Sequence, residues 1–241
     1  MTDHLTTSTA PTEGIDCAPA DRVSGDPLRP STAVTKSLLG YGVIAGPIYV
    51  VVALAQAVTR EGFDLARHQW SLLANGSNGW IQVANFVVTG LMVIAFAVGL
   101  RRALRPGKGA CWAPRLIAVY GASLIAAGTF RADPALGFPV GAPEQPAAIS
   151  WHGMLHFAAG GIGFTCLAIA CFIIGARYAA EGRRGWAGFS RLTGVVFLAG
   201  FAMVASSGGN QAANLAFVAA VILVWTWMTC VAVDRYRGVS R

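Results

Sequence analysis

The sequence carries little charge for its length. Of its 241 residues, 12% are Asp, Glu, Lys or Arg, whereas 55% belong to the set AVILMFWYC, and the mean hydropathy is +0.56. An average soluble domain carries about 25% charged residues, so this chain lacks the polar side chains that would cover a water-facing surface. The composition therefore excludes an ordinary soluble globular protein and indicates a membrane protein.

Cysteines and the common catalytic motifs are also scarce. The five cysteines are too few, and odd in number, for a disulfide scaffold. The chain contains no GxxxxGK[ST], no GxGxxG that opens a helix after a strand, no GxSxG and no CxxC. ATP-driven transport, dinucleotide chemistry and α/β-hydrolase catalysis therefore have no support in the sequence.

What the chain does have is a series of apolar segments, each close to the length of about 20 residues that crosses a bilayer as a helix. No segment alternates like a strand, and a helix satisfies its own backbone hydrogen bonds in lipid. The predicted spans are 37–58, 79–100, 113–130, 151–175, 191–206 and 211–233. We therefore predict an all-α integral membrane protein, a bundle of six transmembrane helices.

The segments outside these spans define the remaining organisation. Residues 1–35 are rich in Thr, Ser, Pro and Asp and nearly free of large apolar side chains, so we predict a disordered cytoplasmic tail. Residues 36–235 form the six-helix membrane domain, and residues 236–241 end the chain as a second cytoplasmic tail.

The positive charges are distributed unevenly between the loops. All but three of the 18 Lys and Arg residues fall in the termini or in the loops around 101–115 and 177–191, and the exceptions are Arg60, Arg67 and Arg131. The positive-inside rule then places both termini in the cytoplasm and predicts a multi-pass protein of the plasma (inner) membrane. The same distribution explains the net charge of +7 by contact with the lipid bilayer, without nucleic acid as a partner.

Polar side chains gather on the opposite, non-cytoplasmic side. Ionisable groups near hydrocarbon are costly unless they are paired or functional, so these residues are the candidates for a site. The predicted polar cluster consists of Asp64, Arg67, His68, Ser71, Asn85, Arg131, Asp133 and Asn214.

The histidines in this region have two possible roles, in a zinc site or in a network of hydrogen bonds. His152 and His156 are spaced i, i+4 and share one helical face, so together with His68 they are candidates for a zinc site. The alternative is a network of hydrogen bonds without metal. In that network, Arg67 and Arg131 pair with Asp64 and Asp133, and the histidines form hydrogen bonds with neighbouring backbone groups or hydroxyls.

A weak repeat places one polar side chain about a turn below the outer interface in three of the helices. The three residues are Asn85, His156 and Asn214, and buried polar groups in a bundle form hydrogen bonds across helices. We expect all three to point inward.

The first outer loop has apolar residues at roughly helical spacing. Phe63, Leu65, Trp70, Leu72 and Leu73 predict a short amphipathic helix over 62–73 that lies at the interface as a lid and holds His68 beside His152.

Taken together, these motifs resemble those of the bacterial family of domain of unknown function 998. The resemblance rests on Gly46-Pro47, GFDLARHQWSLLANGSNGWIQVANF (62–86), RADPALGFPVG (131–141) and SWHGMLHF (150–157), and it covers roughly residues 36–235. It implies a six-helix membrane architecture and no established activity. The residues that match at the outer face are Asp64, His68, Ser71, Asp133, Pro134, His152 and His156.

Three functions remain as hypotheses. The first is a binding or scaffold bundle that holds a lipid or small amphiphile at its non-cytoplasmic face, with no cofactor, since no complete catalytic set is evident. The second is a membrane-embedded zinc hydrolase acting on a lipid-like substrate, and the third is a small-solute transporter. The sequence does not indicate an oligomeric state.

Overall fold

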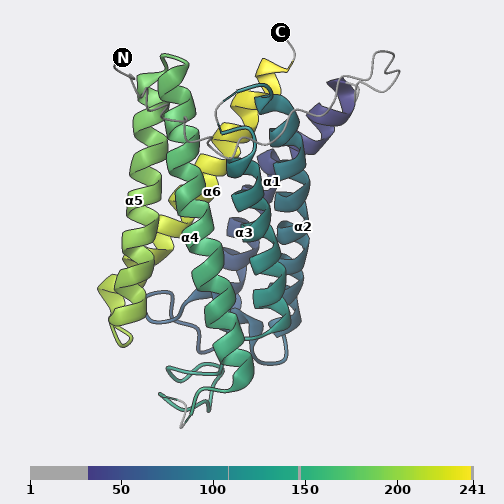
Figure 1. Cartoon of the computed structure of the whole chain (residues 1–241). Coiled ribbons are helices and arrows are strands. Elements are labelled where there is room, and N and C mark those ends of the chain that lie inside the picture. The colour runs from purple at the N-terminus through teal and green to yellow at the C-terminus, as the bar shows by residue number, and fades with distance from the viewer. Residues whose placement is uncertain (1–31, 108, 146–147, 240–241) are drawn as a thin grey trace, which may run out of the picture.

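The structure, a computed structural model, describes residues 32–107, 109–145 and 148–239, and all of its long elements are α-helices (Figure 1). The helices are α1 (Thr32–Thr59), α2 (Gly79–Leu104), α3 (Trp112–Thr129), α4 (Trp151–Ala180), α5 (Arg184–Ser206) and α6 (Gln211–Gly238). A short 3-10 helix, η1 (Trp70–Ala74), lies between α1 and α2. The six helices of the described part correspond one to one with the six predicted spans, and the predicted all-α class is confirmed.

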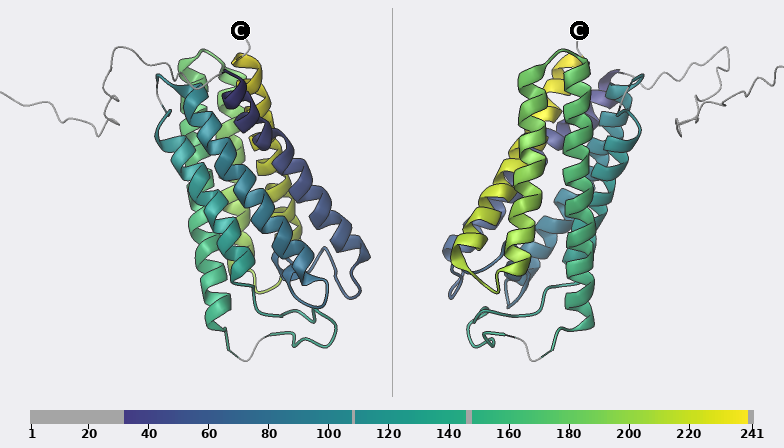
Figure 2. Two further views of the ribbon diagram at one scale, coloured as in Figure 1. Left: turned by 90° about the vertical axis from the view of Figure 1, so that its right-hand side faces the viewer. Right: turned by 60° about the vertical axis from the view of Figure 1, so that its left-hand side comes forward.

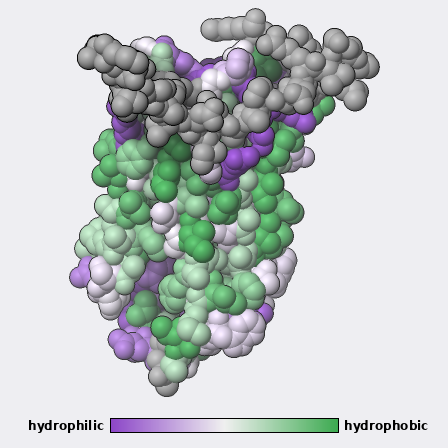
Figure 3. Space-filling model, viewed as in Figure 1, coloured by the Kyte–Doolittle hydropathy of each residue, from purple (hydrophilic) through white to green (hydrophobic). Residues whose placement is uncertain are grey.

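Five of these helices, all except α3, are long and apolar enough to cross a membrane. Helix α3 has 18 residues, and Pro114 and Arg115 in its first turn shorten its apolar run. Several long helices of this kind in one chain make the protein a multi-pass membrane protein. The outer face agrees, because exposed apolar side chains cover the middle of the bundle and polar residues gather toward its ends (Figure 3).

The helices form a ring in chain order. Each helix packs against the next, and α6 closes the ring against α1 (Figures 1 and 2). Large side chains fill much of the interior, including Phe96 from α2 and Trp225 and Trp227 from α6, all of which are almost fully buried. The core therefore lies inside the ring, where each helix contributes one face.

Glycine allows two of these helix pairs to approach closely. A Cβ added at Gly46 of α1 would stand 2.6 Å from the Thr229 hydroxyl of α6, and one added at Gly90 of α2 would stand 2.6 Å from the Gly121 carbonyl of α3. Small residues at such points let backbones pack in lipid, where no hydrophobic effect drives helices together.

The two ends of the bundle differ in what they carry. Helix α1 begins and α6 ends at one end, which we call the terminal end (Figure 1). The other end, the distal end, carries three loops: the first distal loop (60–78), the second distal loop (130–150) and a short third loop (207–210). Helix α1 begins at Thr32, four residues before the predicted boundary at 36, and the rest of the predicted N-terminal tail lies outside the described residues.

Candidate functional site

The first distal loop does not form the predicted amphipathic helix over 62–73, so that prediction is wrong. Gly62 has φ of +76°, the Ala66 N–H donates to Asp64 Oδ1 at 2.8 Å, and only residues 70–74 turn as the 3-10 helix η1. Such local bonds from side chain to backbone compete with helix formation. The apolar side of the loop still packs onto the bundle, since Trp70 and Leu73 are buried.

His68 is buried at the centre of this loop and uses both ring nitrogens. Its Nδ1 accepts a hydrogen bond from the Asp64 N–H at 2.8 Å, and its Nε2 donates to the Leu136 carbonyl at 2.9 Å. The rings of Phe63 and Phe138 pack around it, with centroids 5.1 and 5.5 Å from that of His68. His68 therefore ties the first distal loop to the second and has no free nitrogen lone pair for a metal.

Asn214 of α6 holds the same loop from below. Its side chain is fully buried, and its Nδ2 donates to the carbonyls of Leu65 at 2.9 Å and His68 at 3.2 Å. Arg60 performs a similar task from the end of α1, donating to the carbonyls of Leu73 at 3.1 Å and Asn75 at 2.6 Å. Desolvation in this position lowers the pKa of Arg60.

His156 lies on the inner face of α4. Its Nδ1 donates to two carbonyls at the end of α3, those of Phe130 at 2.9 Å and Ala127 at 3.1 Å. The ring is 7% exposed and borders the cavity described below, and Nε2 has no hydrogen-bond partner among the described residues. In the neutral tautomer set by Nδ1, Nε2 is an acceptor that remains free for a ligand.

The zinc site that His68, His152 and His156 were candidates for has no support from this geometry. His68 lies between the two distal loops and His156 bonds to the end of α3. His152 is exposed, and its ring is tilted against that of Trp151 with centroids 3.6 Å apart. Among the residues that the structure describes, no group of three or more His, Cys, Asp or Glu is placed to hold a metal ion. The i, i+4 spacing correctly placed His152 and His156 on one helix, but the two side chains contact different neighbours.

The predicted ion pairs of this region are also replaced by other contacts. Asp133 accepts from the Ser150 N–H at 2.8 Å and from its hydroxyl at 2.5 Å, and Ser150 in turn caps α4 by accepting from the Gly153 N–H at 3.0 Å. Arg67 forms its ion pair with Glu144 at 2.8 Å rather than with Asp64. Asp133 therefore organises the start of α4, where a carboxylate is favoured by the helix dipole.

Asn85 belongs to a second polar group, deeper between α1 and α2. Its Nδ2 donates to the Tyr49 carbonyl at 3.1 Å and to Gln82 Oε1 at 3.3 Å, and Gln82 Oε1 also accepts from Gln56 Nε2 at 2.8 Å. The eight residues of the predicted polar cluster thus lie in separate groups, and Arg131 is exposed at the surface. Gln56 and Gln82 were not predicted as members of the cluster, although each is a glutamine within an apolar predicted span.

A cavity of about 520 Å³ lies inside the ring at the distal end. Its walls are mainly aromatic and aliphatic, and the aromatic members from the helices are Tyr49, Phe86, Tyr120, Phe157, Phe164, Phe197, Phe201 and Phe217. A few polar side chains also line it, namely Gln69, Ser71, Ser123, Asp133 and His156. Apolar walls with a small number of polar groups are typical of a pocket for an organic ligand, and the volume falls in the usual range of about 300–1,000 Å³.

The polar lining residues are not spread evenly. Gln69, Ser71 and Asp133 come from the distal loops, and His156 is in the second turn of α4. Ser123 lies farther in, near the middle of α3, whereas the α5 and α6 walls are apolar. Most of the polar lining residues therefore lie at the distal end, and the interior is largely apolar.

The terminal end has a smaller cavity of about 350 Å³, lined in part by Arg102 and Arg235, and its helices are joined by ion pairs. Asp234 of α6 accepts two hydrogen bonds from Arg183, at 2.8 and 2.6 Å, and one from the Tyr178 hydroxyl at 2.9 Å. The Tyr178 ring lies between two guanidinium groups, with Arg183 4.7 Å and Arg235 4.5 Å from its centroid. Bidentate contacts of this kind hold the guanidinium in one orientation.

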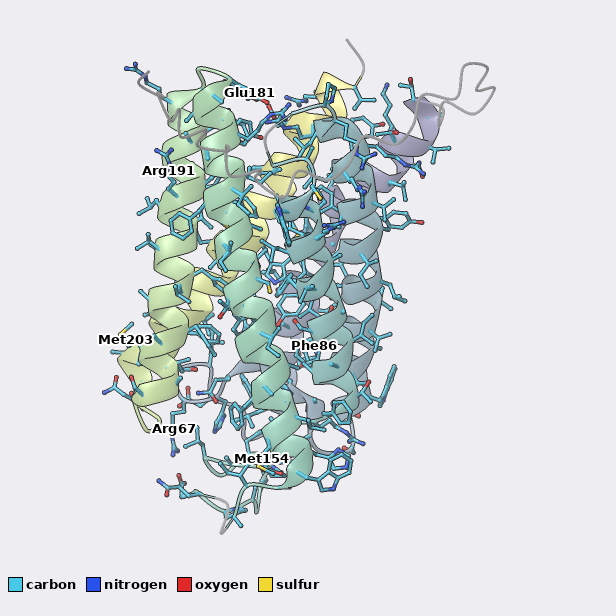
Figure 4. The ribbon with its side chains drawn as sticks, viewed as in Figure 1. Arg67, Phe86, Met154, Glu181, Arg191 and Met203 are labelled. Carbon is cyan, nitrogen blue, oxygen red and sulfur yellow. The ribbon has the colours of Figure 1, made fainter. Side chains whose placement is uncertain are left out.

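Glu181 completes this network on the loop between α4 and α5 (Figure 4). It accepts two hydrogen bonds from Arg235, both at 3.0 Å, and one from Arg177 at 2.6 Å. Partial burial alone would raise the pKa of Glu181, but the hydrogen bonds from the two arginines outweigh it and lower the pKa. From the sequence, these arginines indicated only which side of the membrane is cytoplasmic, and their ion pairs were not predicted.

The ring of apolar helices, the cavity at one end and the ion pairs at the other define a multi-pass helical membrane protein with a pocket of ligand size. The chain belongs to the family described as "Protein of unknown function (DUF998)", which it matches over residues 43–234, and this confirms the resemblance drawn from its motifs. No curated protein and no solved structure matches the chain.

Proposed function

We propose that this protein binds a lipid or small amphiphile in the cavity at its distal end. The observation that carries the proposal is the cavity of about 520 Å³, largely apolar inside and polar at its distal end. An amphiphile has the same division, so its chain would replace water against aromatic walls while its head meets Asp133, Ser71 and His156.

We also propose how the chain crosses the membrane. All six helices span the membrane, both termini are cytoplasmic, and the distal end faces the non-cytoplasmic side of a bacterial plasma membrane. The distribution of Lys and Arg supports this orientation, because the distal loops hold few of them. Helix α3 would span as a short helix between α2 and α4, with its first turn at the membrane surface.

Photolabelling tests the binding proposal. Purified protein is titrated with a long-chain monoacylglycerol that carries a diazirine in its chain, and labelled peptides are mapped by mass spectrometry. We expect saturable labelling of about one probe per chain, concentrated on cavity residues such as Phe164 and Phe217. Labelling that does not saturate, or that falls only on the outer faces of the helices, would contradict the proposal.

A matched pair of variants on α3 sharpens the test. Ala127 lines the cavity, whereas Ala122 is exposed on the same helix. Ala127→Phe places a ring in the cavity and is expected to weaken probe binding at least tenfold. Ala122→Phe adds the same side chain to the outer face and is expected to leave binding unchanged.

A further inference from the structure

Two residues that line the cavity, in the distal halves of α4 and α5, are also exposed at the outer surface. Phe157 of α4 lines the cavity and is also 62% exposed, and Ala205 of α5 is likewise both a lining residue and exposed. A side chain that meets both the cavity and the outer surface stands at an opening. The two residues come from the facing edges of neighbouring helices.

The packing between α4 and α5 changes along their length. Toward the terminal end, a Cβ added at Gly175 or Gly194 would stand 3.2 or 3.1 Å from a carbonyl of the other helix. Toward the distal end, a Cβ added at Gly160 would meet nothing within 4 Å, although Gly160 lines the cavity. The ribbons of the two helices accordingly separate toward the distal end (Figure 1).

The position of this opening matches the orientation of an amphiphile in a bilayer. Most of the polar lining residues lie at the distal end, next to the membrane surface in the proposed topology, and the apolar walls lie deeper. A ligand moving sideways from the facing leaflet would keep its head at the interface and its chain in hydrocarbon throughout. No desolvation of the head in the bilayer centre is then required.

The charges of the lining restrict the head of the ligand. Among the described lining residues, Asp133 is the one ionisable acid and none is Lys or Arg. An anionic head would meet a carboxylate without a cation to offset it. His156 presents Nε2, which in the tautomer described above accepts a hydrogen bond from a hydroxyl group.

We therefore propose that the ligand is a hydroxyl-bearing amphiphile whose head carries no negative charge, and that it enters from the membrane through a lateral opening between α4 and α5. This inference rests on the proposed binding function, and it adds the route of access and the chemical class of the head.

Two matched pairs of variants test the route, one on each side of the opening. Gly160 and Gly161 both have open space where a Cβ would stand, but only Gly160 lines the cavity, and on α5 Ala205 lines it whereas Ala202 is exposed without lining it. The protein is reconstituted in phosphatidylcholine vesicles that contain the diazirine monoacylglycerol. The rate of cavity labelling is then measured after flash illumination at increasing times.

We expect Gly160→Trp and Ala205→Trp to slow cavity labelling at least tenfold, while Gly161→Trp and Ala202→Trp label at the rate of the unmodified chain. Equal rates for the members of both pairs would overturn the lateral route. If one cavity-side variant fails to fold, the pair on the other helix decides. Absence of saturable labelling in the unmodified chain would instead contradict the binding function itself.

The class of the head is tested with two probes of the same chain. The monoacylglycerol is compared with an alkyl phosphate, which is ionised at neutral pH. We expect the uncharged probe to bind at least tenfold more tightly, and equal or tighter binding of the phosphate would overturn the assignment. His156→Phe removes the Nε2 acceptor and is expected to reduce the difference between the two probes.

Discussion

The two ends of the bundle are joined by different kinds of contact. At the distal end, side chains such as His68 and Asn214 bond mainly to backbone carbonyls and N–H groups of the loops. At the terminal end, Arg183 and Arg235 form bidentate pairs with Asp234 and Glu181. The distal contacts are therefore mainly neutral and hold loops, whereas the terminal contacts are charged and join the ends of helices.

The arginines at the two ends of the bundle also differ in what they contact. Arginines near span ends orient the chain, but at the terminal end they also connect α4, α5 and α6. Arg67, by contrast, pairs with Glu144 at a surface where the two side chains are 38% and 69% exposed. An arginine–carboxylate pair should therefore contribute more to the free energy of unfolding at the terminal end than at the distal end.

The largest effect is expected from removing Asp234. Asp234→Ala leaves Arg183 and the Tyr178 hydroxyl without their shared acceptor, and losing a partly buried acceptor of several hydrogen bonds costs about 2–3 kcal/mol. The measurement is the free energy of unfolding in mixed micelles. Asp234→Asn, which keeps the shape and one acceptor oxygen, should lose less. Equal stability of Asp234→Ala and the unmodified chain would contradict a structural role for the network.

A smaller effect is expected from Asn214 at the distal end. Asn214→Ala removes two hydrogen bonds and leaves the Leu65 and His68 carbonyls without this donor, at a cost of about 1–2 kcal/mol. Hydrogen exchange should rise in the first distal loop and stay unchanged at the terminal end. Gln211→Ala, an exposed position on the same helix, serves as the control. Hydrogen exchange that rises equally in both variants would contradict the role of Asn214 in holding the first distal loop.

Acid should weaken the terminal end through Glu181. Because the pKa of Glu181 is lowered in the folded protein, its contribution to stability is present at neutral pH and is lost as the pH falls below the ordinary glutamate value of about 4.3 and through the lowered pKa. The melting temperature of the unmodified chain should therefore fall more steeply between pH 5 and pH 3 than that of Glu181→Gln, whose side chain does not titrate. Parallel curves for the two proteins would contradict this role of Glu181.

The smallest effect is expected for Arg67. Both partners of its ion pair are substantially exposed, so Arg67→Ala should change the free energy of unfolding by less than about 1 kcal/mol. A loss as large as that of Asp234→Ala would mean that the two ends do not differ in the way described.

The helices could be predicted from the sequence because each apolar segment in lipid must satisfy its own backbone. Hydropathy alone located all six, and polar residues within them, such as Asn214 and His156, are buried as the spacing suggested. Neither the closure of α6 against α1 nor the divergence of α4 from α5 is encoded in any single segment. The cavity therefore could not be predicted from hydropathy.

The first distal loop shows why the site was harder to predict. Its apolar spacing favoured a helix, but His68 bonds to Leu136, a partner far along the chain, and Asp64 forms a local turn. Contacts of this kind depend on which loops meet in three dimensions. The Ser150 cap of α4 could have been predicted from the sequence, since serine before an apolar run is a common signal for the start of a helix.

Native mass spectrometry of the protein released from gentle detergent tests the central claim most directly. We expect one bound amphiphile per chain in the unmodified protein and in Ala122→Phe, and its loss in Ala127→Phe. A bare chain in every preparation, or the same bound mass in Ala127→Phe as in the unmodified protein, would contradict the claim that the distal cavity is a binding site.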